Sequence, residues 1–186
     1  MIIGNPYNFA IESEIVKAYS HPGFLGLGYF IVHVKNQTYG IRDDEATLLA
    51  GALGSMQEHL EWRGKHIAEF AGRLDSVLLS NLIYGSIYRD AEEVGWPYPL
   101  PQDEIEKTVI KNNLLEKCFD QAFDDGSYLS IIDNEESTRV LAFRSTSEYD
   151  VCDVSEAIIA SDEFYSILES WTGSILRQWK SMKKES

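Results

Sequence analysis

The fold of this chain is decided by residues 24–64, which read FLGLGYFIVHVKNQTYGIRDDEATLLAGALGSMQEHLEWRG. Residues 29–34 place apolar side chains on both faces of an extended chain, and bulky β-formers dominate, as in a β-strand. The turn-prone residues 35–37 interrupt this run, and residues 38–41 then predict a returning strand. The first part of the stretch is therefore a β-hairpin.

The second part of the stretch changes period and predicts an amphipathic helix from Glu45 to about Trp62. Asp43 and Asp44 precede it and offer carboxylate acceptors to the free N–H groups of a helix start. A lone hairpin is marginally stable in water, so we expect the helix to pack on its apolar face. The apolar residues that recur at spacings of three and four are Leu48, Leu49, Ala52, Leu53, Met56 and Leu60.

The same order of hairpin and helix recurs near the C-terminus. Residues 128–132 and 139–143 predict two strands, and a long helix is expected to follow, with Ser155 or Ser161 as its N-cap. The other expected elements are a strand at 8–15, a short strand or helical turn at 65–70, and helices at 75–88 and 102–123. We therefore expect one globular domain over residues 1–186, of the α+β class: an antiparallel sheet built from hairpins, with amphipathic helices packed on one face.

The charge of the chain is strongly negative and unevenly distributed. The net charge is −14, and residues 90–169 contain 20 acidic and 5 basic residues. Such a surface repels nucleic acid and anionic lipid, whereas it attracts a basic protein partner. Solubility alone is the alternative explanation. No signal-peptide pattern opens the chain and no apolar run approaches the roughly 20 residues of a membrane span, so a cytoplasmic protein is expected.

No motif in the sequence predicts catalysis, a metal or a cofactor. Gly23, Gly26 and Gly28 precede a strand instead of opening a helix, which argues against a phosphate loop. The four histidines lack metal-ligand spacing, and a G-x-S-x-G motif is absent. Four acidic pairs could in principle serve a hydrolase, but each falls at a predicted helix end or turn: Asp43/Asp44, Asp103/Glu104, Asp124/Asp125 and Glu135/Glu136.

Two features suggest a surface that binds another protein. Acidic residues flank the second hairpin, and they form either a solvated rim or a docking face for a basic partner. Trp96 and Tyr98 lie in a loop with three alternating prolines, where the indole either packs on the core or contacts the partner. The candidate partner-binding residues are Trp96, Tyr98, Asp124, Asp125, Asp133, Glu135 and Glu136.

Two segments resemble immunity protein family 42 of bacterial polymorphic toxin systems. They are the opening MIIGNPYNFAI (residues 1–11) and the hairpin GYFIVHVKN (residues 28–36) with Tyr39-Gly40 after it. The resemblance implies a small cytoplasmic protein that binds a cognate toxin domain and blocks it. The leading hypothesis is therefore an antitoxin that inhibits by direct, stoichiometric binding. The alternatives are a small acidic hydrolase and a non-catalytic regulatory or structural module.

Overall fold

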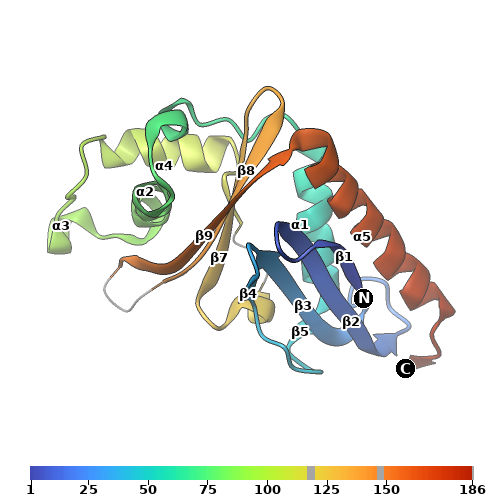
Figure 1. Cartoon of the computed structure of the whole chain (residues 1–186). Coiled ribbons are helices and arrows are strands. Elements are labelled where there is room, and N and C mark those ends of the chain that lie inside the picture. The colour runs from blue at the N-terminus through green and yellow to red at the C-terminus, as the bar shows by residue number, and fades with distance from the viewer. Residues whose placement is uncertain (117–119, 146–148, 186) are drawn as a thin grey trace.

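The predicted hairpin forms β3 and β4 of the first of two sheets, with β3 in the interior of the sheet and β4 at its edge (Figure 1). The structure, a computed structural model, describes residues 1–116, 120–145 and 149–185. In the first sheet β2 lies between β1 and β3, and β3 pairs along its other edge with β4 and β5, while β10 adds parallel to β2. The strands are β1 (Ile2–Asn5), β2 (Phe9–Tyr19), β3 (Gly26–Val34), β4 (Gln37–Tyr39), β5 (Thr47–Leu48) and β10 (Lys184–Glu185).

Local backbone geometry sets the register of this sheet. Lys35 and Asn36 both have positive φ angles, of 50° and 64°, as a tight two-residue hairpin turn requires. Gly28 lies so close to β2 that a Cβ atom would be 1.8 Å from the carbonyl oxygen of Glu14. Close approach of two strands, rather than phosphate binding, therefore explains this glycine.

Two helices cover the inner face of the first sheet. α1 (Leu49–Glu61) packs on β3, and α5 (Ser161–Ser181) packs on β2. The fully buried Trp171 of α5 meets Phe30 edge-on at 5.1 Å, and its indole N–H donates to the hydroxyl of Ser13. α1 begins later than predicted because Thr47 and Leu48 pair with β3 as β5. Asp43 does not cap the helix and instead accepts from the backbone N–H of Glu45 in a local turn.

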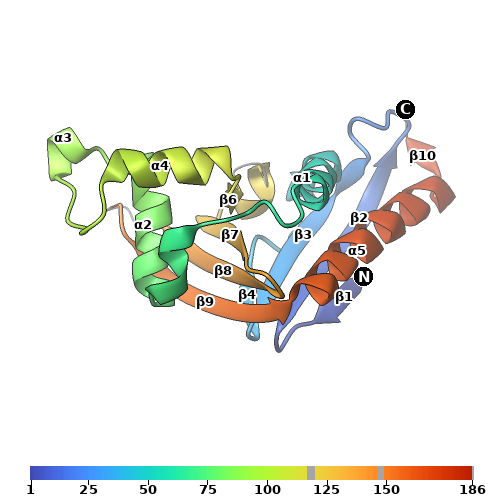
Figure 2. The same ribbon diagram turned by 90° about the horizontal axis from the view of Figure 1, so that it is seen from above.

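The second sheet is buried on both faces in β7 and in the middle of β8, whereas β9 is exposed on one side. Its strands are antiparallel in the order β6 (Leu115–Glu116), β7 (Ser127–Asp133), β8 (Ser137–Ser145) and β9 (Val151–Ala160). Val140 and Ala142 of β8 belong to the core shared with the first sheet, whereas Leu141 and Phe143 face α2 (Ser76–Tyr88) and α4 (Gln102–Lys111). Figure 2 shows these strands between α2 and α4 at one end of the molecule and α1 and α5 at the other.

The structure corrects two expected elements. The helix expected over 102–123 ends at Lys111, because Asn113 has a positive φ of 48° and the chain then enters β6. Neither serine expected as an N-cap takes that role: Ser155 lies within β9, and Ser161 is the first residue of α5, whose N-cap position is Ala160. The remaining short elements are the 3-10 helices η1 (Glu69–Arg73) and η2 (Asp120–Phe123) and the helix α3 (Ala91–Val94).

The α+β class is confirmed, with helices on one face of the first sheet and on the outer face of the second. Apolar residues from both sheets form one core cluster. Hydrogen bonds also join the two sheets: the hydroxyl of Tyr39 donates to the carbonyl of Asp153, and Arg144 donates to the carbonyl of Thr38. These contacts support the single domain, which stays a prediction.

Leu53 tests the assignment of the inner face of α1. Its side chain is buried beneath the helix, so Leu53→Asp should place an unpaired charge in the core and lower the free energy of unfolding by more than about 3 kcal/mol. Glu58→Ala on the exposed face is the control and should cost under about 0.5 kcal/mol. Chemical denaturation measures both, and a native midpoint for Leu53→Asp would contradict the packing described.

Candidate partner-binding surface

The structure separates the predicted acidic residues to the two ends of the β7–β8 hairpin. Asp124 and Asp125 precede β7, whereas Glu135 and Glu136 lie in the turn after it. The seven residues of β7 span roughly 20 Å. The two acidic groups therefore do not form one continuous surface patch, and Trp96 and Tyr98 lie with α2 and α4, apart from both.

The first acidic group is partly neutralised. The carboxylate of Asp125 accepts bonds from the guanidinium of Arg144 at 3.2 and 3.3 Å and from the backbone N–H of Ser127. The Asp124 side chain is exposed. At this end of the hairpin, the Asp125 carboxylate is therefore bonded to a cation, and the Asp124 carboxylate is exposed to solvent.

Asp133 has an internal role. Only 5% of it is exposed, and its carboxylate accepts from the backbone N–H of Gly64 and from the hydroxyls of Thr138 and Tyr165, at 2.7–2.8 Å. Burial and then the Asp133 carboxylate raise the pKa of Tyr165 well above its usual value, which keeps the phenol protonated as a donor. The Asp133 carboxylate is therefore already bonded within the protein, where it joins three segments of the fold.

The indole of Trp96 is folded back onto the protein. It packs over Gly85 of α2, meets Tyr98 edge-on at 4.8 Å, and donates from Nε1 to the carbonyl of Leu100 at 2.6 Å. Burial raises the pKa of the Tyr98 phenol, in keeping with its place against the same cluster. Of the two expectations for Trp96, packing on the core agrees with these contacts.

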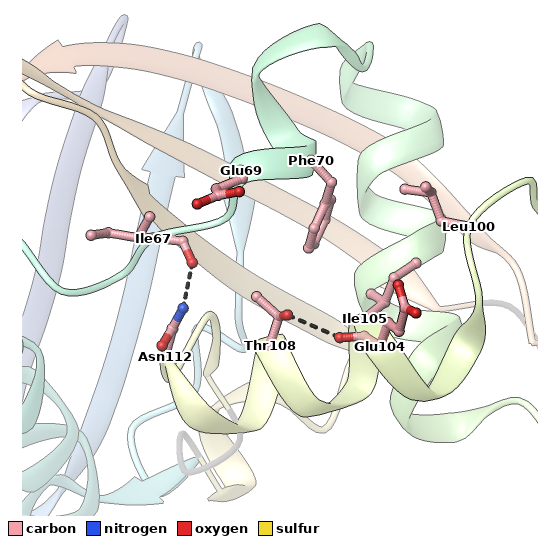
Figure 3. Close-up of a pocket in the computed structure, with 8 residues that line it drawn as sticks. All are labelled: Ile67, Glu69, Phe70, Leu100, Glu104, Ile105, Thr108 and Asn112. Atoms are coloured by element: carbon pink, nitrogen blue, oxygen red, sulfur yellow. Dashed lines mark hydrogen bonds between the residues drawn. The ribbon is translucent and has the colours of Figure 1, made fainter.

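Two hollows lie side by side on the surface near α4 and the β7–β8 turn. The first, of about 390 Å³, is drawn in Figure 3, and the second has a volume of about 490 Å³. Ile67 and Glu69 line both. The first is also lined by Phe70, Leu100, Glu104, Ile105, Thr108 and Asn112, and the second by Gly64, Ala68, Gly72, Asp133, Asn134 and Glu135.

The carboxylates on these hollows differ from several acidic side chains that form ion pairs within the chain. Glu69, Glu104 and Glu135 are exposed, and within the described part of the chain their side chains have no bonded partner. Many other carboxylates are paired with internal cations: Asp103 with Lys107, Asp125 with Arg144, Asp150 with Arg89, Glu156 with Arg139 and Asp162 with Arg63. The hollows therefore carry negative charge that the fold itself leaves uncompensated.

A buried chain of polar groups supports the segment that carries Ile67. The Nδ1 atom of His66 lies 3.0 and 3.1 Å from the carbonyl oxygens of Asn113 and Asn112, so Nδ1 must carry the proton and donate. Its Nε2 then accepts from Nδ1–H of His59, 3.3 Å away. On the far side, Nε2 of His59 lies 2.6 Å from the carboxylate of Glu116.

A second polar cluster lies on the outer face of the first sheet. The buried carboxylate of Glu12 accepts from two nitrogens of Arg42 and lies 2.9 Å from Nε2 of His33. Burial alone would raise the pKa of Glu12, but the bonds and charges of Arg42 and His33 outweigh burial and lower it. Because these groups satisfy one another, the cluster accounts for His33 without a ligand.

Two further observations concern the described residues. They contain no group of three or more histidine, cysteine, aspartate or glutamate side chains placed to hold a metal ion. None of the helices formed by residues 1–116, 120–145 and 149–185 combines the length and the apolar character of a membrane span.

The sequence analysis did not single out Ile67, Glu69 or Glu104 as partner-binding residues. Its only indication was the segment 65–70, expected as a short strand or a helical turn, in which η1 now begins at Glu69. An exposed isoleucine next to a buried histidine would indicate a binding segment. The sequence does not reveal this combination, because His66 is buried only through its contacts with α1 and with the end of α4.

Replacing Trp96 tests its packing role. Trp96→Ala removes the ring from α2 and the bond to Leu100, so the free energy of unfolding should fall by about 2 kcal/mol, less than for a fully buried tryptophan. Thermal denaturation measures the loss. An unchanged melting temperature would mean that the indole does not stabilise the fold. It would favour the alternative that Trp96 contacts the partner.

The buried histidines predict a stability that depends on pH. Burial, and next the nearby His59, lower the pKa of His66 below its usual 6.5. As pH falls below 6.5 the unfolded chain therefore takes up the proton first, and stability is lost, by up to about 1.4 kcal/mol per pH unit.

Denaturant titrations between pH 7.5 and 5 should show this decline, and His66→Gln should flatten it. Carboxylates with lowered pKa, such as Glu12, lose their contribution only at more acidic pH, so this window isolates the histidines. Equal slopes for the wild type and the variant would contradict the role given to His66.

Comparison with known proteins places this fold in a family. Curated proteins show no match to the chain. Among solved structures, the chain is similar to CdiI from Burkholderia dolosa AUO158, with a TM-score of 0.64 and 15% sequence identity. The alignment covers 94% of this chain and 99% of the CdiI chain, and at this identity it shows a shared fold. The family model of immunity protein 42 matches residues 1–174, and the chain therefore belongs to the immunity protein 42 family.

Proposed function

We propose that this immunity protein neutralises its cognate toxin domain by binding it directly, one molecule to one, in the cytoplasm and without catalysis. The observation that carries the proposal is the uncompensated negative charge of the surface. The chain has a net charge of −14, and Glu69, Glu104 and Glu135 have no cation bonded to them in the described part of the chain.

The charge favours a basic toxin domain as the partner. A negative surface accelerates encounter with a positive one, and it also covers the basic groups that a toxin would use on an anionic substrate. The same charge opposes binding of nucleic acid or anionic lipid by the immunity protein itself. Inhibition by occupying the toxin therefore requires no chemistry from this chain.

The hydrolase alternative is less well supported by the acidic pairs. In three of the four pairs one carboxylate has a structural partner. Asp43 accepts from a backbone N–H, Asp103 pairs with Lys107, and Asp125 pairs with Arg144. A pair of carboxylates that works as acid and base needs both members free to exchange protons with substrate.

The test uses the cognate toxin domain, which is to be sought among the genes that adjoin the gene of this chain. Co-expression should rescue cells from that domain, and titration calorimetry of the purified pair should give a stoichiometry of one. Because surface charges accelerate the encounter with an oppositely charged partner, Glu135→Lys/Glu136→Lys should slow association about 10-fold at low salt.

The matched control reverses two exposed carboxylates outside the acidic region, Asp44→Lys/Glu45→Lys, and should slow association much less. Rescue without any complex between the purified proteins would overturn direct inhibition. An association rate that does not depend on ionic strength would overturn the basic partner.

A further inference from the structure

We propose that the toxin domain docks in the two adjoining hollows around Ile67 and inserts a basic side chain beside this residue. The inference rests on the proposed function, because it names the surface through which that inhibition occurs. We call the surface the Ile67 groove, and it consists of Ile67, Glu69, Phe70, Leu100, Glu104 and Glu135.

The shape of the groove is suited to side chains of a partner. The two hollows, of about 390 and 490 Å³, share Ile67 and Glu69, so they are adjacent parts of one surface. Ile67 is 49% exposed although it is a large apolar residue. An exposed isoleucine between two hollows provides apolar contact area at the centre of the surface, where binding energy concentrates in protein interfaces.

The charges of the groove select a cationic partner. Glu69 and Glu104 border the first hollow and Glu135 the second, and none of the described residues that line them is a lysine, an arginine or a histidine. The apolar side chains of Phe70 and Leu100 line the first hollow together with Glu69 and Glu104 (Figure 3). Lysine and arginine match this combination, since their aliphatic stems pack on apolar surface while their charged ends meet carboxylates.

The backbone of the groove is held in place by the interior. The carbonyl of Ile67 accepts from the Asn112 side chain at 2.6 Å, and the carbonyl of His66 accepts from the backbone N–H of Asp133 at 2.7 Å. Arg139 donates to the carbonyls of Ala71 and Leu74 at the end of the same segment. A surface ordered before binding loses little conformational entropy when the partner docks, which favours affinity.

Two other hollows fit a basic partner less well. The one lined by Tyr19, Phe24 and Leu48 is almost wholly apolar, and nothing in the structure indicates what would cover it. The one lined by Lys35, Asp153 and Glu156 carries charges of both signs. The Ile67 groove is favoured because it combines concave shape, an exposed apolar centre and uncompensated carboxylates.

The first experiment separates contact in the groove from long-range charge. Glu69→Lys/Glu104→Lys changes two groove carboxylates, and Glu92→Lys/Glu93→Lys changes two exposed carboxylates of α3 by the same total charge. Calorimetry with the cognate toxin domain should show binding at least about 30-fold weaker for the groove variant. The α3 variant should change binding less than about 3-fold. Equal weakening by both variants would overturn the groove.

The second experiment tests the apolar centre. Ile67→Ala should weaken binding about 10-fold through faster dissociation, whereas Ile110→Ala, at a 57% exposed isoleucine of α4 outside the groove, should leave binding unchanged. Melting temperatures of both variants should stay near that of the wild type. An Ile67→Ala protein that is native in stability and binds normally would overturn the groove.

The two proposals fail in different ways. Wild-type protein that forms no complex with the toxin domain overturns the proposed function. Wild-type protein that binds one to one, while the groove variants bind as tightly as their controls, overturns the groove alone and leaves direct inhibition standing.

Discussion

The buried carboxylate of Asp133 holds together the parts of this protein that form its candidate binding surface. It accepts from Gly64 after α1, from Thr138 on β8 and from Tyr165 on α5, while its own backbone N–H donates to the carbonyl of His66. A buried charge is stable only when such donors surround it, and once they do it orients each of them. The position of the segment that carries Ile67 follows from these bonds.

The second sheet holds the segment between α1 and α2 in place, although most of that segment forms no regular helix or strand. β7 and β8 carry buried apolar residues on both faces, so one face completes the core of the first sheet and the other supports α2 and α4. The chain between α1 and α2 crosses the edge of this layer, where His66 and Arg139 fasten it by bonds to and from carbonyl groups. The shape of the groove therefore depends on how the second sheet packs with α1 and α2, and not on the connecting loop alone.

Much of the fold could be predicted because it follows from local patterns. The hairpin at residues 24–41, α1, α2 and α5 follow from apolar spacing and turn residues. The prediction was wrong at residues 112–116 and 120–123, where apolar residues continue at helical spacing but the chain leaves the helix and forms β6 and η2; Leu114 and Leu115 pack in the cluster beneath α2 and α4. Residues 117–119 of the predicted helix lie outside the described residues. At the candidate site, Glu135 is a surface carboxylate beside a hollow, as its charge predicts. Asp133, only two residues earlier, is buried. Sequence pattern treats these two acids alike.

The sequence by itself determined the α+β class, the faces of its main helices, the acidic character of the surface and the resemblance to an immunity family. Each of these depends on residue type or on short spacing along the chain. Only the tertiary structure decided that the strands form two sheets, that the Trp96 ring folds back over α2, and which carboxylates remain free. Burial and ion pairing join residues far apart in the chain: Gly64 and Tyr165 both bond Asp133, across 69 and 32 residues. Such contacts exist only after the core has assembled, so no local pattern records them.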